Sequence, residues 1–170
     1  NLHTAVYDPT ANRLIVYGGC SGNCGPFLAD AWVLTNANGL GGAPEWLQLP
    51  SGIARAGQGA AYDAISNRLI VFGGFNGGFM NRVDVLVDAN GVGNPQWISL
   101  APIGTAPPAR EGESNVTYDP ITNRLIVFGG RSSNTQLYND VWVLSNANGT
   151  GGPAEWSQLL PVGDAPAPRY

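Results

Sequence analysis

The sequence contains few of the side chains that hold metals or carry out catalysis. Its 170 residues include no lysine, one methionine, two cysteines (Cys20 and Cys24) and a single histidine, His3. A zinc centre usually takes four ligands from Cys, His, Asp or Glu, and a Ser–His–Asp triad needs a histidine with its partners. Because neither set can be assembled here, we expect no metal, no cofactor and no enzymatic activity, and we interpret His3 as a core or channel-lining residue.

Charge and long apolar runs are equally scarce. Only 12% of the residues are charged, and the 12 acids exceed the 8 bases, all arginine, leaving a formal net charge of −4. Nucleic-acid binding depends on positive charge, so a nucleic-acid partner is not expected. The longest apolar runs are short pieces such as residues 14–17. A membrane-spanning helix needs about 18 apolar residues, so we expect no membrane span.

Glycine, by contrast, is abundant, and the chain repeats itself. The 24 glycines and 13 prolines, beside 44% hydrophobic residues, indicate a globular protein with many turns. Residues 7–19 recur as 62–74 and 118–130, with nine of thirteen positions identical in all three copies and spacings of 55 and 56 residues. Residues 31–39 also recur, without gaps, as 83–91 and 141–149. The chain therefore divides into three units, 1–54, 55–109 and 110–170.

Each unit has the pattern of four β-strands. No window of eleven residues shows the i, i+3, i+4, i+7 spacing of an amphipathic helix. In the first unit we predict strands at 3–7, 13–17, 31–35 and 45–49. The turn at 8–12 contains a proline and an asparagine, which favour a hairpin, and the doublet Gly18-Gly19 ends the second strand where a side chain would obstruct the chain. We predict a four-stranded antiparallel meander in every unit.

Repeating four-stranded units with periodic glycine and tryptophan are typical of β-propellers, and a period of about 50 residues is that of kelch blades. The chain resembles the kelch-repeat family over essentially its whole length. The resemblance rests on the glycine doublets, on the segment 30–34 with its aspartate and tryptophan, and on the fourth-strand tryptophans Trp46, Trp97 and Trp156. It implies an all-β fold of three kelch-type β-propeller blades. The sequence departs from the family in its turn between the third and fourth strands, which is longer than usual.

Three blades do not close a ring, since a propeller takes about 4 to 8. Two lateral blade faces would be left as exposed apolar patches. If one copy followed another, Arg169 would precede Tyr7 by eight residues, the same spacing as Arg110 to Tyr118. No strand is left over to build a shared closing blade. We therefore predict half of a six-bladed ring, completed by a longer array or by self-association into a homo-oligomer.

Cys20 and Cys24 lie in a glycine-containing loop that has no counterpart in the other units. Two cysteines four residues apart in such a turn can approach to disulfide distance, and a free thiol pair is the alternative. Disulfides persist in oxidising compartments. Together with the absence of lysine and the abundance of asparagine and glycine, this loop leads us to expect an extracellular or cell-surface protein.

Arginines recur just before the first strand of a unit, at Arg55 and Arg110, and Arg169 stands near the end of the chain. A guanidinium fork pairs well with a carboxylate. The aspartates that precede the third strand in the first and third units, Asp30 and Asp140, are the natural partners. We predict that these ion pairs tie neighbouring blades together, with contact between the arginines and a ligand as the alternative.

The second unit departs from this pattern. Arg82 replaces the aspartate and Asp84 replaces the tryptophan of the third strand, two residues apart and therefore on one strand face. Exchanging a core tryptophan for a charge is costly unless the position is solvated or paired. We interpret the exchange as a local adjustment, with a functional role as the alternative.

The loops between the second and third strands, 20–29, 75–80 and 131–139, vary while the surrounding sequence repeats. Variable loops on a rigid scaffold commonly carry function. The Asn-Gly turns at the other end of each unit faintly resemble calcium-binding loops. Because Asn-Gly is the strongest hairpin signal, we interpret these turns as structural. Aromatic and arginine side chains are favoured at interfaces. The candidate ligand- or partner-binding residues are Phe27, Phe75, Phe79, Arg82, Arg131 and Tyr138.

These observations predict a non-catalytic module for protein or ligand binding and assembly, with an unknown protein or glycan bound at the loop face. One alternative is a glycan-binding or glycan-processing propeller, since propellers often present aromatic side chains around the mouth of the channel. Hydrolysis would need paired carboxylates at the centre of the ring. Glu111 and Glu113 are the only acid pair near the predicted channel. The other alternative is a purely structural subunit of a ring or filament.

Overall fold

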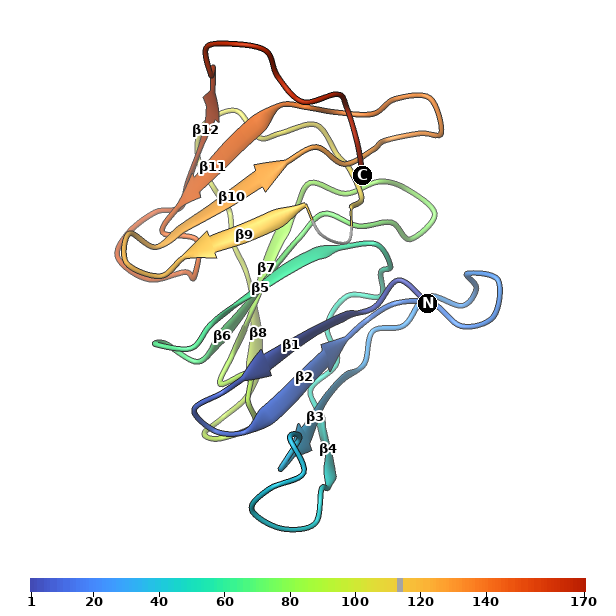
Figure 1. The fold of residues 1–170 in the computed structure, drawn as a ribbon, viewed down its shortest axis with the longest axis vertical. Coiled ribbons are helices and arrows are strands. Elements are labelled where there is room, and N and C mark those ends of the chain that lie inside the picture. Colours follow the sequence, from blue (N-terminus) through green and yellow to red (C-terminus); the bar gives the residue numbers. More distant parts are fainter. Residues whose placement is uncertain (113–114) are drawn as a thin grey trace.

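The computed structural model describes residues 1–112 and 115–170, and in them the chain forms three four-stranded antiparallel sheets (Figure 1). Each sheet is called a blade. The strands of blade 1 are β1 (Thr4–Asp8), β2 (Arg13–Tyr17), β3 (Ala31–Thr35) and β4 (Trp46–Leu49). Blade 2 contains β5 (Gly59–Asp63), β6 (Arg68–Phe72), β7 (Val83–Val87) and β8 (Gln96–Ser99). Blade 3 contains β9 (Val116–Asp119), β10 (Arg124–Phe128), β11 (Val141–Ser145) and β12 (Glu155–Leu159).

The predicted all-β fold with three meandering blades is confirmed. Within each blade the strands pair in sequence order, and the described residues contain no helix. The first strand begins and ends one residue later than predicted, and the fourth begins one residue later, at Trp46. Accordingly, no helix of the length and hydropathy needed to cross a membrane occurs in residues 1–112 and 115–170.

The hairpin between the first two strands is set by an aspartate and an asparagine. The Oδ1 atom of Asp8 accepts the backbone N–H groups of Thr10 and Ala11 at 3.0 and 3.3 Å, and Asn12 adopts a left-handed φ of 53°. Asparagine tolerates this conformation better than most residues because its short polar side chain bonds locally. The turn fixes the register of β1 on β2, in which Asp8 faces Arg13.

The glycine doublets end the second strand of each blade because another part of the chain passes directly over them. Gly19 has a φ of 97°, and a Cβ atom there would lie 2.7 Å from the carbonyl oxygen of Asn1. Its N–H donates to the carbonyl of Arg55 at 2.8 Å. The doublet therefore anchors the segment that leaves one blade and enters the next.

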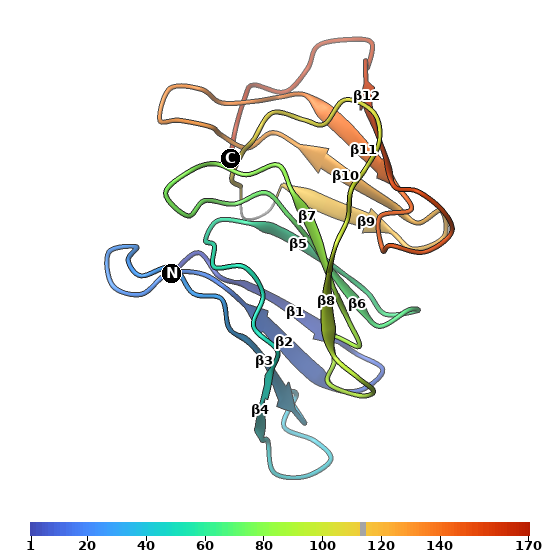
Figure 2. The same cartoon turned by 180° about the vertical axis from the view of Figure 1, so that it is seen from behind.

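The three blades lie side by side in sequence order, with blade 2 between blades 1 and 3 (Figures 1 and 2). The first strands β1, β5 and β9 form the inner edge, where β5 contacts both β1 and β9, while β4, β8 and β12 lie at the outer edge. The loops that join the second to the third strands all project to the same side, where both termini also lie, on the right in Figure 1. The opposite side carries the hairpins and the Asn-Gly turns.

Two apolar cores fill the spaces between blades. The first packs Ile15 and Val33 of blade 1 against Leu69 and Leu86 of blade 2. The second packs blade 2 against blade 3 and includes Trp156. Alternate residues of a strand point to opposite faces of its sheet. Blade 2 therefore packs one face against blade 1 and the other against blade 3. One face of blade 1 and one of blade 3 remain without a neighbouring blade.

Candidate functional site

Four of the six candidate binding residues meet on the side of the blades that carries the loops between second and third strands. A groove with a volume of about 290 Å³ runs across blades 1 to 3 there. Its lining includes Cys24, Phe27, Phe75, Phe79, Glu111 and Arg131. We call this groove, with its lining, the loop groove. It brings together four of the six candidate binding residues.

An aromatic cluster forms the apolar part of the loop groove. Phe27 comes from the β2–β3 loop, and Phe75 and Phe79 come from the β6–β7 loop. The ring centroids of Phe27 and Phe75 are 5.7 Å apart in an edge-to-face arrangement, and those of Phe75 and Phe79 are 5.0 Å apart. Such pairs add stability beyond the area they bury. The rings are only partly buried, so they present a preformed apolar surface.

An ion pair forms the polar part of the loop groove. The Nε atom of Arg131 donates to Oε1 of Glu111 at 2.7 Å, and their side chains are 25% and 11% exposed. The backbones of the same two residues exchange hydrogen bonds of 2.9 and 2.8 Å. The Arg131 guanidinium also lies 4.1 Å from the ring centroid of Tyr170. The guanidinium is therefore fixed in place with part of its edge facing the groove.

Cys20 and Cys24 are joined in a disulfide within the β2–β3 loop. Cys20 is almost fully buried and its N–H donates to the carbonyl of Asn1 at 2.8 Å, whereas Cys24 lines the loop groove. The disulfide thus connects the blade to the part of the loop that carries Phe27.

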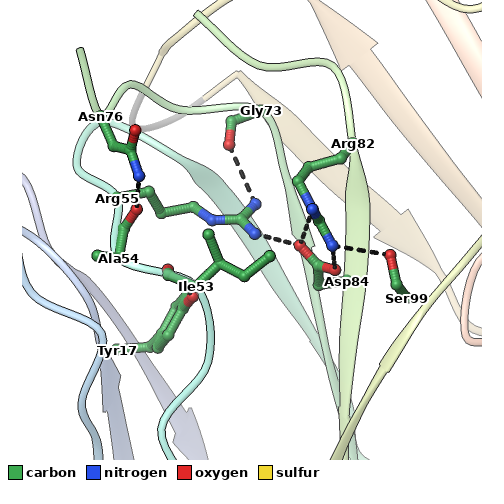
Figure 3. A network of polar contacts seen from close by, with 9 residues as sticks. All are labelled: Tyr17, Ile53, Ala54, Arg55, Gly73, Asn76, Arg82, Asp84 and Ser99. Carbon is green, nitrogen blue, oxygen red and sulfur yellow. Dashed lines mark hydrogen bonds and ion pairs between the residues drawn. The ribbon is translucent and has the colours of Figure 1, made fainter. Parts of the chain in front are cut away.

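Two of the predicted binding residues lie elsewhere. The Tyr138 hydroxyl is 2.8 Å from Oγ of Ser132, and its ring packs against the Arg110 guanidinium at 4.1 Å. Arg82 lies in blade 2, where it is bonded to Asp84 and to Oγ of Ser99 (Figure 3). Neither belongs to the lining of the loop groove. Arg82 contacts the strands of blade 2, and Tyr138 contacts Ser132 of its own loop and Arg110.

The arginines before the blades occupy buried inter-blade positions, but only one of them meets the predicted aspartate. Arg110 pairs with Asp140 through two bonds of 2.6 and 2.9 Å. Arg55, fully buried, donates to the carbonyl of Gly73 at 3.2 Å and pairs with Asp84 (Figure 3). Within one chain, Asp30 pairs with no arginine among the described residues, because Arg55 and Arg110 each reach forward into the blade that follows them.

Asp84, which stands in place of the tryptophan in blade 2, is therefore paired with arginines. Asp84 accepts from Arg55 and also from Arg82, whose Nε and Nη2 atoms donate at 2.8 and 2.7 Å. Burial opposes ionisation of this carboxyl, but the hydrogen bonds from Arg82 and the charge of Arg55 outweigh burial and hold its pKa below 3.8. The carboxylate takes the place of the tryptophan because two guanidinium groups compensate for its burial.

A second polar contact between blades, on the hairpin side, was missed by the sequence analysis. Oδ2 of Asp8 in blade 1 accepts the hydroxyl of Tyr62 at 3.0 Å and Nδ2 of Asn90 at 3.0 Å, both from blade 2. Arg13 of blade 1 donates to the Asn90 carbonyl at 2.7 Å. We call this set the hairpin clamp. The repeated Tyr-Asp pairs were its only signal in the sequence.

The hairpin clamp recurs between blades 2 and 3 with equivalent residues. Asp63 accepts the hydroxyl of Tyr118 at 3.2 Å and Nδ2 of Asn148 at 2.9 Å, and Arg68 donates to the Asn148 carbonyl at 2.9 Å. The Asn-Gly turns that contain Asn90 and Asn148 thus join blades, as a structural interpretation of these turns requires.

In comparisons with known proteins, one family model matches nearly the whole chain. The family model described as the KLHDC2/KLHL20/DRC7 Kelch-repeats domain matches residues 2–170. Kelch repeat-containing protein 2 of Saccharomyces cerevisiae (strain ATCC 204508 / S288c) is 28% identical over 163 residues, which cover 92% of this chain and 18% of the yeast protein. The solved structure of YjhT matches with a TM-score of 0.45 and 15% identity, covering 95% of this chain and 65% of that one. The chain thus spans only part of either protein.

Proposed function

Because the chain belongs to the kelch-repeat family, whose domain indicates a protein-interaction module, we propose that it binds a protein segment in the loop groove. The observation that carries this proposal is the convergence of three phenylalanines and a fixed arginine in one groove. Aromatic and arginine side chains dominate the binding energy of many interfaces. The groove is formed by the loops that vary between blades, while the repeated parts serve as framework.

The chemistry of the loop groove defines the segment it suits. Phe27, Phe75 and Phe79 offer a partly buried apolar surface to an aliphatic or aromatic side chain. Arg131 is held by Glu111, so the net charge of this pair is zero and the site does not select a strongly charged ligand. The guanidinium still has N–H groups beyond its bond to Glu111, which suits a backbone carbonyl. We propose a short extended peptide with one large apolar side chain as the ligand.

We propose further that the module is non-catalytic. Of the two acids considered for glycan hydrolysis, Glu111 is bound to Arg131, and Glu113 lies outside the described residues. The Glu111 carboxylate is therefore already occupied by the Arg131 guanidinium, at 2.7 Å. The test is an assay with a panel of oligosaccharides, in which turnover that is abolished by Glu111→Gln would contradict the proposal.

We propose further that the protein is extracellular or lies at the cell surface, and that it associates with copies of itself. The disulfide between Cys20 and Cys24 supports the location, because such bonds persist outside reducing compartments. Self-association is supported by the outer face of blade 1, where Trp46 is 52% exposed although the equivalent Trp156 is 4% exposed between blades. Exposed apolar patches of this kind mark interaction surfaces.

Peptides selected from a displayed random library against the whole chain provide the probe for the loop groove. We expect Phe79→Ala and Arg131→Ala each to weaken the selected peptides about tenfold, which corresponds to about 1.4 kcal/mol. The control is Ile121→Ala, because Ile121 is 91% exposed on the hairpin side. Peptides that bind all variants equally well, or that lose affinity only on substitution of Asn90 or Asn148, would contradict the proposal.

A further inference from the structure

Blade 3 shows how an arginine from the preceding blade is received. Arg110 follows blade 2 in the chain, and its side chain is fully buried in blade 3. The guanidinium donates to the carbonyl of Gly129 at 2.8 Å and to both oxygens of Asp140. Nε1 of Trp142 donates to the same carboxylate at 2.7 Å. We call this arrangement of glycine carbonyl, aspartate and tryptophan the arginine socket.

Blade 1 carries the same socket on its outer face. Gly18, Asp30 and Trp32 stand at the repeat positions of Gly129, Asp140 and Trp142. Nε1 of Trp32 donates to Asp30 at 2.7 Å, as its counterpart does in blade 3. A hollow of about 210 Å³ lies there, lined by Asn1, His3, Val16, Gly18, Asp30 and Trp32 among others. Within residues 1–112 and 115–170, no arginine pairs with Asp30.

Arg169 is presented in the same way as the arginine that fills the socket of blade 3. Its N–H donates to the carbonyl of Tyr138 at 3.1 Å, and its carbonyl accepts from Gly130 at 2.8 Å. Arg110 has the equivalent backbone bonds to blade 2. In both residues Nε donates at 3.0 Å to the carbonyl two residues earlier, that of Ala167 or Pro108. Arg169 is exposed, however, and pairs with no acid among the described residues.

The two outer faces also hold the two halves of a hairpin clamp. In the internal clamps, an aspartate of the earlier blade accepts from a tyrosine and an asparagine of the later blade. Blade 3 presents the aspartate, Asp119, at the equivalent position, and blade 1 presents Tyr7 and Asn38. Tyr7 is 43% exposed. Donors and acceptors on these faces are therefore matched at both ends of the blade.

The apolar parts of the faces match as well. On the outer face of blade 1, Val16, Trp32 and Trp46 line an apolar hollow of about 480 Å³. The residues at the same positions of blade 3, Val127, Trp142 and Trp156, are buried against blade 2. The internal interfaces of this chain thus show which kind of surface covers the outer face of blade 1, namely the opposite face of a blade like blade 3.

We propose that the outer face of blade 1 binds the outer face of blade 3 of a second copy, with Arg169 of that copy seated in the socket formed by Gly18, Asp30 and Trp32. The proposal rests on the self-association stated above and identifies the surfaces and the key ion pair. Each chain has one face of each kind, so the contact is heterologous and two copies can satisfy both faces at once. A closed pair of this kind contains six blades.

Sedimentation of the whole chain over a range of concentrations, with neutralising variants, tests the proposal. We expect the wild type to form a dimer. Asp30→Asn and Arg169→Gln should each raise the dissociation constant at least tenfold, because each leaves a charge without its partner in the contact. The matched control is Asp88→Asn, which should associate like the wild type, since blades 1 and 3 have asparagine at this turn position.

Charge reversal distinguishes the proposed contact from any other mode of association. Chains with Asp30→Arg and chains with Arg169→Asp should each remain monomeric alone, because like charges then meet in the socket. An equimolar mixture should associate, because one native pair and one reversed pair form between the two variants. Circular dichroism verifies that each variant is folded. A dimer that is indifferent to all these changes would overturn the Arg169 assignment alone, whereas a wild-type monomer at all concentrations would overturn self-association as well.

Discussion

Asp84 is the acid on which two guanidinium groups of blade 2 depend, and its replacement by asparagine has a predictable cost. The change preserves size and removes the charge. The Arg55 and Asp84 side chains are 0% and 6% exposed, whereas that of Arg82 is 39% exposed. Removing one partner of a buried ion pair costs about 3–5 kcal/mol because the other charge stays buried. We expect about 3 kcal/mol, the low end of that range, because Arg55 keeps its bond to Gly73 and Arg82 can turn towards water.

Thermal unfolding monitored by circular dichroism measures this cost. For a chain of this size, 1 kcal/mol corresponds to about 2–4 °C, so Asp84→Asn should lower Tm by about 6–12 °C. Arg82→Gln is the matched comparison, because it leaves Asp84 paired with Arg55 and removes a partly exposed partner. It should cost about 1 kcal/mol or less. If Arg82→Gln were as destabilising as Asp84→Asn, the buried charge of Arg55 would not be the reason for the aspartate at this position.

The remaining predictions concern the apolar and acidic contacts between blades. Trp156→Ala should cost about 3–5 kcal/mol in chemical denaturation, because Trp156 is 4% exposed. In dilute monomer, Trp46→Ala should cost about 1 kcal/mol or less, and equal losses would contradict the assignment of inner and outer faces. Burial disfavours the charged form of Asp63, but hydrogen bonds from Asn148 and Ser66 outweigh it and hold its pKa below 3.8. Because its pKa is lower in the folded state, Asp63 stabilises the protein at pH values above its unfolded-state pKa, so stability should fall as the pH drops below about 4. Asp63→Asn should make this decline shallower. An unchanged slope would contradict the role of the hairpin clamp.

The blades could be predicted from sequence because each is built from local and repeated signals. Asp8, Asn12 and Gly18-Gly19 mark the hairpin and the end of the second strand in a form that recurs twice more. Three copies in register allow a weak strand pattern to be read with three observations per position. The boundaries differ by one residue because the pairing of a terminal residue depends on its neighbour strand, which a single strand does not specify.

Contacts between blades were harder to predict because they join residues far apart in the chain. The pair of Arg110 with Asp140 was expected, because an arginine recurs before the first strand and an aspartate recurs before the third strand. The partner of Arg55 was not, because Asp84 stands where the other blades have tryptophan. The bond from Asn90 to Asp8 spans 82 residues. The sequence around Asn90 does not distinguish an asparagine that only forms a turn from one that also bonds to the neighbouring blade.

The loop groove was predicted in part. The phase of the repeats places the variable loops on one side, which brings Phe27 close to Phe75 and Phe79. The bond between Arg131 and Glu111 was not foreseen, because it depends on the backbone pairing of the segment that precedes β9 with the segment that follows β10. Arg82 and Tyr138 were chosen by residue type alone, and residue type does not reveal whether a side chain faces a groove or a neighbouring blade.

Hydrogen exchange of the chain with and without a peptide selected on it tests the central claim, that the loop groove is the binding site, most directly. We expect slowed exchange to be concentrated in residues 73–82 and 129–132, which carry or adjoin Phe75, Phe79 and Arg131. The Asn-Gly turns at 36–42 and 88–94 should exchange at the same rate in both samples. Slowed exchange confined to those turns, with none in the loops, would contradict the claim.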